Sequence, residues 1–182
     1  MTLLTWSEAV WADRAALMAF ACTEPPRRER LRNMPKVYPR PWERDVEAYI
    51  RDFRPPGPAD QTFLVGRDDE GIGAVCAFTR DDPSPDWMIK LQIVAVDNRY
   101  RGQGGAVADE AITLAMQTAF DAVASRGHPQ VYVFGLIDTR NTASQRMCQR
   151  RGFISEGEAP DAEGYEQWSV AVTFDPAAAP LT

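Results

Sequence analysis

Runs of apolar residues and their periodicity divide the chain into strands and helices. Apolar runs bounded by turn-forming residues predict seven strands, over 2–6, 61–67, 71–80, 89–96, 130–137, 153–156 and 165–174. Apolar positions at helical spacing predict helices over 8–21, 41–53, 105–126 and 141–151. Ser7 is a good N-cap for the first helix, and Pro41 suits the first turn of the second. The elements therefore follow the order β-α-α-β-β-β-α-β-α-β-β.

This order predicts an α/β fold with a mixed central sheet of about six or seven strands flanked by helices. Pro-rich stretches over 24–41 and 81–86 interrupt the pattern and predict loops. A chain of 182 residues, 45% hydrophobic, fits one domain with a substantial core. We expect that domain to span residues 1–174 and the tail 175–182 to be disordered.

The net charge of the chain and the spacing of its cysteines exclude several classes of function. A formal net charge of -6 argues against general nucleic-acid binding. The three cysteines are widely spaced and the chain has a single histidine, so we expect no metal site and a reduced, cytoplasmic setting. The apolar stretch 9–21 contains Asp13 and Arg14, so we expect neither a signal segment nor a membrane span.

A glycine-rich turn carries the strongest candidate chemistry. Residues 96–106, VDNRYRGQGGA, lie between a predicted strand and a helix N-terminus, where backbone N–H groups can bind an anion. Gly102, Gly104 and Gly105 let the backbone approach a phosphate, and Arg101 adds a charged donor. A nucleotide-triphosphate loop would need a Lys-Ser or Lys-Thr pair. A dinucleotide loop would need a third glycine where Val107 stands.

The run from Arg101 to Ala106 reads R-x-x-G-x-A and resembles the pyrophosphate loop of the GNAT superfamily of N-acetyltransferases, which bind acetyl-coenzyme A. Asn98 stands where many members have proline. The resemblance implies that the whole turn contacts the coenzyme, through Arg101, Gly102, Gln103, Gly104, Gly105 and Ala106.

A second segment, 141–153 (NTASQRMCQRRGF), resembles the same family. Its pattern is carried by Asn141, Ser144, Met147, Cys148 and Gly152-Phe153, with cysteine where relatives usually have tyrosine. The two motifs occur in the family's order, and the resemblance covers about residues 60–174. It implies that Asn141 and Ser144 contact the coenzyme, although Asn141 is equally suited to cap a helix.

The resemblance also implies roles on the central strand and at its neighbours. The backbone of Val94 and Val96 would bind the pantetheine arm. Lys90 stands where some relatives place a glutamate base, with Gln92 next on its face. Asp138 is an alternative base or a solvated loop residue. Cys148 is either a weak proton donor to the leaving thiolate or a small packed residue.

The sequence therefore predicts an N-acetyltransferase acting on a small-molecule or protein amine, by direct attack in a ternary complex. The alternative is an acyl-coenzyme A-binding sensor or partner-binding module with weak or lost catalysis. The acidic stretch 156–166 either attracts a cationic acceptor or is a solvated loop. Dimers are frequent among similar proteins, so a homodimer is one expected state.

Overall fold

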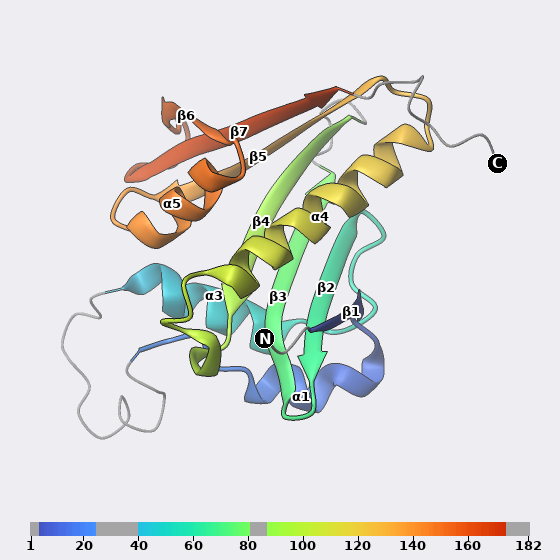
Figure 1. The fold of residues 1–182 in the computed structure, drawn as a ribbon, viewed down its shortest axis with the longest axis vertical. Coiled ribbons are helices and arrows are strands. Elements are labelled where there is room, and N and C mark those ends of the chain that lie inside the picture. The colour runs from blue at the N-terminus through green and yellow to red at the C-terminus, as the bar shows by residue number, and fades with distance from the viewer. Residues whose placement is uncertain (1–3, 25–39, 81–86, 174–182) are drawn as a thin grey trace. The chain divides into compact units, whose positions relative to one another are not determined.

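The computed structural model describes residues 4–24, 40–80 and 87–173 (Figure 1). Within these ranges seven strands form one mixed sheet in the order β1-β2-β3-β4-β5-β7-β6, which confirms the predicted α/β architecture. The strands are β1 (Thr5–Glu8), β2 (Gln61–Asp68), β3 (Gly71–Arg80), β4 (Met88–Val96), β5 (Gln130–Asp138), β6 (Ile154–Glu158) and β7 (Tyr165–Thr173). The α-helices are α1 (Arg14–Ala19), α3 (Pro41–Asp52), α4 (Ala106–Ala124) and α5 (Thr142–Arg150), with short 3-10 helices η1 (Trp11–Asp13) and η2 (Asn98–Tyr100).

The chain divides into two compact units. Unit 1 comprises Met1–Ala77 with Ile93–Ala111, and unit 2 comprises Phe78–Gln92 with Ile112–Thr182. The strands β3 and β4 and the helix α4 have residues in both. The predicted tail 175–182, the predicted loop 81–86 and most of the predicted loop 24–41 lie outside the described residues.

The predicted start of the first helix is wrong. Ser7 lies in β1, which pairs antiparallel with β2, and the α-helix begins only at Arg14. Before it, the carboxylate of Asp13 accepts the N–H of Val10 at 2.8 Å and pairs with Arg67. Pairing with β2 satisfies backbone groups that the predicted first turn would otherwise have used, so strand pairing overrides the local cap signal.

Unit 1 buries apolar side chains on both faces of its part of the sheet. The larger cluster joins α1 and α3 to the strands, and its members include Leu17, Ile50 and Ile93. The smaller cluster contains Leu4 and Val107, with Val96 packed against it. Because neighbouring residues of a strand point to opposite faces, β4 contributes to both clusters and is fixed from both sides at its C-terminal end.

Unit 2 is built on the pairing of β5 with its neighbours. The strand β5 pairs in parallel with β4 over Met88–Lys90 and antiparallel with β7 along its whole length, while β6 pairs with β7. A Cβ atom built on Gly135 of β5 would lie 2.8 Å from the backbone carbonyl oxygen of Leu91. Only glycine therefore allows this close approach of the two backbones.

The helix α4 presents an apolar stripe with a spacing of four residues, which includes Ala111, Ala115, Ala119 and Val123, all buried. Such a spacing places the side chains along one face of the helix. Despite this apolar face, no helix within the described ranges has the length and hydropathy required to span a bilayer.

We predict that Gly135→Ala lowers the free energy of unfolding by about 2 kcal/mol, because the new methyl group meets a backbone carbonyl that cannot rotate away. In thermal unfolding this corresponds to a fall in Tm of roughly 4–8 °C for a chain of this size. Leu136→Ala, on the same strand but 37% exposed, is the control and should cost less than half as much. Equal losses for the two variants would show that the close approach is not the cause.

Candidate functional site

The glycine-rich turn between β4 and α4 has the conformation that an anion site requires. Gly102, Gly104 and Gly105 adopt φ angles of 77°, 72° and 83°, in the left-handed region that favours glycine. The whole turn from Arg101 to Ala106, Gln103 included, is exposed. At the three glycines no Cβ atom stands between the backbone and a ligand. Backbone N–H groups of the turn can therefore approach a phosphate.

The start of α4 adds further N–H groups at the same place. The hydrogen bond that begins the helix joins the N–H of Asp109 to the carbonyl of Gly105 at 2.9 Å. The N–H groups of the residues before Asp109 have no carbonyl of an earlier helical turn to bind. Their aligned dipoles favour a negative charge at this end of the helix. The geometry is that expected of a pyrophosphate site, and the coenzyme contacts of the individual residues stay a prediction.

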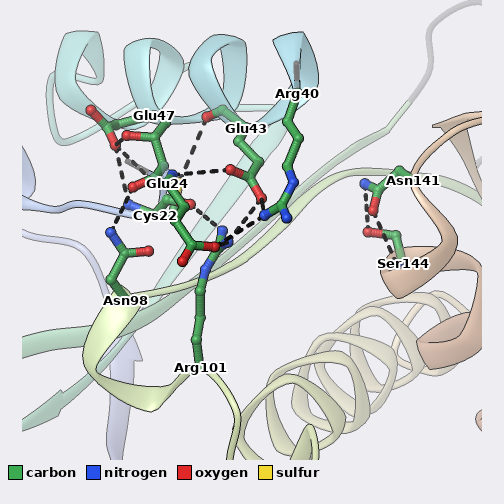
Figure 2. Close-up of polar contacts among 10 residues, drawn as sticks. Cys22, Glu24, Arg40, Glu43, Glu47, Asn98, Arg101, Asn141 and Ser144 are labelled. Carbon is green, nitrogen blue, oxygen red and sulfur yellow. Dashed lines mark hydrogen bonds and ion pairs between the residues drawn. The ribbon is translucent and has the colours of Figure 1, made fainter. Parts of the chain in front are cut away.

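Arg101 is turned toward α3 (Figure 2). Its Nη1 atom lies 2.8 Å from the Oε1 atom of Glu43, and its Nη2 atom donates to the carbonyl of Cys22. Glu24 lies 3.8 Å from the same Nη1 atom. The guanidinium is thus paired with acceptors of the protein, and its expected role as a phosphate ligand stays a prediction.

Asn98 makes two hydrogen bonds that the proline expected at this position could not make. Its backbone N–H donates to the carbonyl of Ala21 at 2.9 Å, and its side-chain amide donates to the carbonyl of Thr23 at 2.7 Å. Proline has neither donor. Asn98 therefore attaches the turn to the segment that follows α1.

Val94 and Val96, whose backbone is expected to bind the pantetheine arm, lie at the C-terminal end of the central strand β4. The side chain of Val96 packs against the smaller core cluster of unit 1, and Val94 is half-buried. The packing of the Val96 side chain leaves its backbone groups for any coenzyme contact, and the backbone role of both residues stays a prediction. Lys90 pairs with Phe134 in the register of β4 and β5, and Gln92 is exposed.

Asn141 caps α5 in unit 2, as its sequence position predicts (Figure 2). Its Oδ1 atom accepts the N–H of Ser144 at 3.2 Å, and its Nδ2 atom donates to the Ser144 hydroxyl at 2.9 Å. The structure thus brings Asn141 and Ser144 together in one cap. The glycine turn belongs to unit 1, and the coenzyme contacts of this pair stay a prediction.

Asp138 is neither a solvated loop residue nor an unpaired base. It ends β5 and is only 5% exposed, and its carboxylate binds the Arg140 guanidinium with contacts of 2.9 and 2.7 Å. The hydrogen bonds from the Arg140 side chain, joined by its backbone N–H, hold the pKa of Asp138 below the ordinary value. A carboxylate of lowered pKa accepts a proton less readily, which weakens the general-base prediction.

Cys148 is buried in α5, with 3% of its surface exposed. Burial raises the pKa of its thiol to about 12. Such a thiol donates its proton less readily than an ordinary cysteine, so the surroundings favour the packing interpretation over the proton-donor interpretation. Cys22 and Cys76 are also free and buried.

A polar cluster on three strands of unit 2 surrounds Glu156 of β6. Its carboxylate accepts hydrogen bonds from Ser169 and Gln167 of β7 and from the Tyr132 hydroxyl of β5. The bond from Ser169 and then that from Tyr132 lower the pKa of Glu156, so the exposed carboxylate stays ionised. The acidic stretch identifies Glu156 in the sequence, but its partners are 11 to 24 residues away and no local pattern connects them.

The connection between β6 and β7 forms an open depression of about 520 Å³, lined by residues 158–163. Three of the lining residues are acids, Glu158, Asp161 and Glu163. Within the described part of the chain, no three His, Cys, Asp or Glu side chains are grouped so that they could hold a metal ion.

A comparison with known protein families gives the class of this protein. A family model described as an acetyltransferase (GNAT) domain matches residues 3–154, and the chain belongs to this family. The resemblance seen in the two sequence motifs is therefore confirmed. The protein is an acyl-coenzyme A-dependent acetyltransferase, and acetyl-coenzyme A is its acyl donor.

Solved structures share the fold at low sequence identity. A PaiA N-acetyltransferase from Thermoplasma acidophilum, in complex with coenzyme A, aligns with a TM-score of 0.62 at 12% identity, over 93% of this chain and 98% of its own. A GNAT-family acetyltransferase from Streptococcus pneumoniae aligns with a TM-score of 0.58 at 18% identity, over 93% and 99%. Among curated proteins, none has significant sequence similarity to this chain.

We predict that Cys148→Ala leaves kcat within about two-fold of the unmodified enzyme, because a buried thiol of raised pKa is a poor proton donor. The variant should instead lower Tm, since it removes a packed sulfur atom. Cys76→Ala, another buried cysteine, serves as the control for packing alone. A fall in kcat of ten-fold or more with unchanged coenzyme affinity would instead assign the thiol a chemical role.

Proposed function

We propose that this protein transfers an acetyl group from acetyl-coenzyme A to an amine by direct attack within a ternary complex. The observation that carries the proposal is the exposed turn of left-handed glycines at the N-terminus of α4. Family membership supports the acyl donor. The proposal adds to this family membership that the acceptor is an amine and that it attacks the thioester directly.

The cysteines support direct attack over a covalent acyl-enzyme. A cysteine nucleophile acts as an exposed thiolate of lowered pKa. All three cysteines are buried, and burial raises the pKa of both Cys22 and Cys148 to about 12. An acyl group held on one of these sulfur atoms is therefore disfavoured.

In the proposed reaction the amine nitrogen attacks the thioester carbonyl carbon, and the carbon–sulfur bond then breaks. A protonated amine first loses one proton to become the nucleophile. After the attack the nitrogen loses a second proton and the leaving thiolate of coenzyme A gains one, so one proton in total is released. The lowered pKa of Asp138 makes that residue a weak acceptor of the amine proton. We propose that water relays the proton to bulk solvent.

The acidic groups of unit 2 support a cationic acceptor. The exposed carboxylate of Glu156 is kept ionised by its hydrogen bonds, and the depression lined by Glu158, Asp161 and Glu163 adds further negative charge. Opposite charges raise the local concentration of a cation and its rate of association. We propose that the acceptor is positively charged before it reacts.

We predict that coenzyme A stabilises the protein and that Gly104→Val removes this effect. Gly104 has a φ angle of 72°, which a β-branched residue adopts only with strain, so the variant should distort the turn. A ligand at 100 times its Kd stabilises the native state by about 2.7 kcal/mol, which thermal shift detects. Gly71→Val, in the β2–β3 turn and also left-handed at 122°, is the control for strain alone and should retain the coenzyme response.

We predict that Glu156→Gln raises KM for a cationic amine by about three- to ten-fold and leaves KM for acetyl-coenzyme A unchanged, because it removes one charge from the acceptor side only. Asp121→Asn, on α4 and outside the acidic connection, removes the same charge and should have a smaller effect. Salt should weaken the attraction in the unmodified enzyme, since exposed charges are screened over about 8 Å at physiological ionic strength. A KM for the cationic amine that neither Glu156→Gln nor salt changes from the value of the unmodified enzyme would exclude the cationic acceptor.

The proposed reaction is tested by the release of free thiol from acetyl-coenzyme A across a panel of primary amines. Turnover with any amine well above hydrolysis in buffer supports the transferase. Tight coenzyme binding without turnover on a broad panel would instead support a sensor or partner-binding module.

A further inference from the structure

The segment Phe20–Glu24 follows α1 and lies between α3 and the turn that leads into the glycine loop, all within unit 1. It belongs to no strand, yet each of its backbone polar groups from the carbonyl of Phe20 to the N–H of Glu24 has a hydrogen-bond partner. Side chains supply almost all of these partners. Such complete pairing outside a sheet fixes the segment in one conformation.

Three side chains of α3 hold one side of the segment. The Oε2 atom of Glu47 accepts the N–H groups of Cys22 and Thr23 at 3.2 and 3.0 Å, and the Thr23 hydroxyl at 2.6 Å. Arg51 donates to the carbonyl of Phe20, and Glu43 accepts the N–H of Glu24 at 3.2 Å. Glu47 is 3% exposed and is paired with Arg51, so its charge is compensated inside the protein.

The turn before the glycine loop, residues 97–101, holds the other side of the segment Phe20–Glu24. Asp97 accepts the N–H of Ala21 at 3.4 Å, Asn98 donates to the carbonyls of Ala21 and Thr23, and Arg101 donates to the carbonyl of Cys22. The segment is therefore a template against which residues 97–101 are placed. Those residues immediately precede the three left-handed glycines.

Glu43 connects the two sides directly (Figure 2). Its Oε1 atom lies 2.8 Å from Arg101 and 3.2 Å from Arg40, while its Oε2 atom accepts the N–H of Glu24. The Glu43 side chain is 10% exposed, against 32% for Arg101 and 45% for Arg40. The ion pair with Arg101 is consequently the better shielded of the two, and it is the one that reaches the loop.

We propose that Glu43 is a positioning residue for the coenzyme loop. It holds the guanidinium of Arg101 and the end of the segment Phe20–Glu24, so the N–H groups after Arg101 keep their arrangement before the coenzyme arrives. A loop fixed in its binding conformation loses less entropy when the ligand binds, which raises affinity without a new ligand contact. The inference rests on the proposed coenzyme role of residues 101–106.

The sign of the change in the coenzyme Kd distinguishes a positioning role of Glu43 from a competing role. If Glu43 positions the loop, its removal weakens coenzyme binding. If Glu43 instead competes with the phosphates for Arg101, its removal frees a cation and tightens binding. The two roles therefore predict changes of opposite sign in one measured Kd.

The experiment measures the Kd of coenzyme A by calorimetry for Glu43→Ala and for Arg40→Ala as its control. Arg40 contacts Glu43 and Glu24 in the same ion network, but it is not part of the turn or the loop. We expect Glu43→Ala to raise Kd about three- to ten-fold and Arg40→Ala to change it less than two-fold. With saturating coenzyme, kcat and the KM of the acceptor should stay unchanged in Glu43→Ala. An unchanged or lower Kd for this variant would overturn the proposal.

A double-mutant cycle tests whether Glu43 acts through Arg101. We expect Glu43→Ala to have little further effect on Kd once Arg101→Ala is present, because the two residues form one unit. Additive effects would overturn the proposal. If Glu43→Ala does not fold, Glu43→Gln keeps one acceptor oxygen without the charge. It should then raise Kd about two- to three-fold, and an unchanged or lower Kd would overturn the proposal.

Gly104→Val separates a failure of this inference from a failure of the loop assignment. If Gly104→Val weakens coenzyme binding and Glu43→Ala does not, only the positioning role of Glu43 is wrong. If Gly104→Val also leaves Kd unchanged, the coenzyme does not bind at this loop and both proposals are wrong.

Discussion

In the proposed function, coenzyme recognition depends on the N–H groups that the start of α4 leaves without helical partners. A helix cannot satisfy its own first N–H groups, so they attract an anion only where the chain before the helix leaves them accessible. Left-handed φ angles at Gly102, Gly104 and Gly105 produce that access. The two apolar clusters of unit 1 fix the end of β4 that leads into this turn, and the remaining polar contacts determine its path.

The sequence predicts the conformation of the glycine turn and the cap of α5 because their determinants are local. Three glycines and the cap residue Asn141 each act within a few residues of their position, where pattern and spacing can be read directly. The start of the first helix could not be predicted in the same way. Ser7 is a suitable cap locally, but its segment pairs with β2, more than fifty residues later in the chain.

The polar groups that support the site were also beyond sequence reasoning. Glu43 contacts Arg101 across 58 positions of the chain, and Glu47 contacts Cys22 across 25. Glutamates on a helix ordinarily suggest a solvated face, and only the fold shows that these two are largely buried and satisfy another segment's backbone. The contacts of Glu156 could not be predicted either, because its side-chain partners come from two other strands.

Four carboxylates of the structure differ in what they contact, and the difference bears on the chemistry. Asp138, Glu43 and Glu47 are occupied in ion pairs or backbone hydrogen bonds of the protein itself. Glu156 is also hydrogen-bonded, but it is exposed and keeps its charge toward solvent.

A lowered pKa suits the binding of a cation and is unfavourable for a base, because the group that best stays ionised is the one that least accepts a proton. In the proposed reaction, the same electrostatics that would attract a charged amine leave its deprotonation to water. Catalysis of that reaction would then depend chiefly on holding the thioester and the amine together in the right orientation.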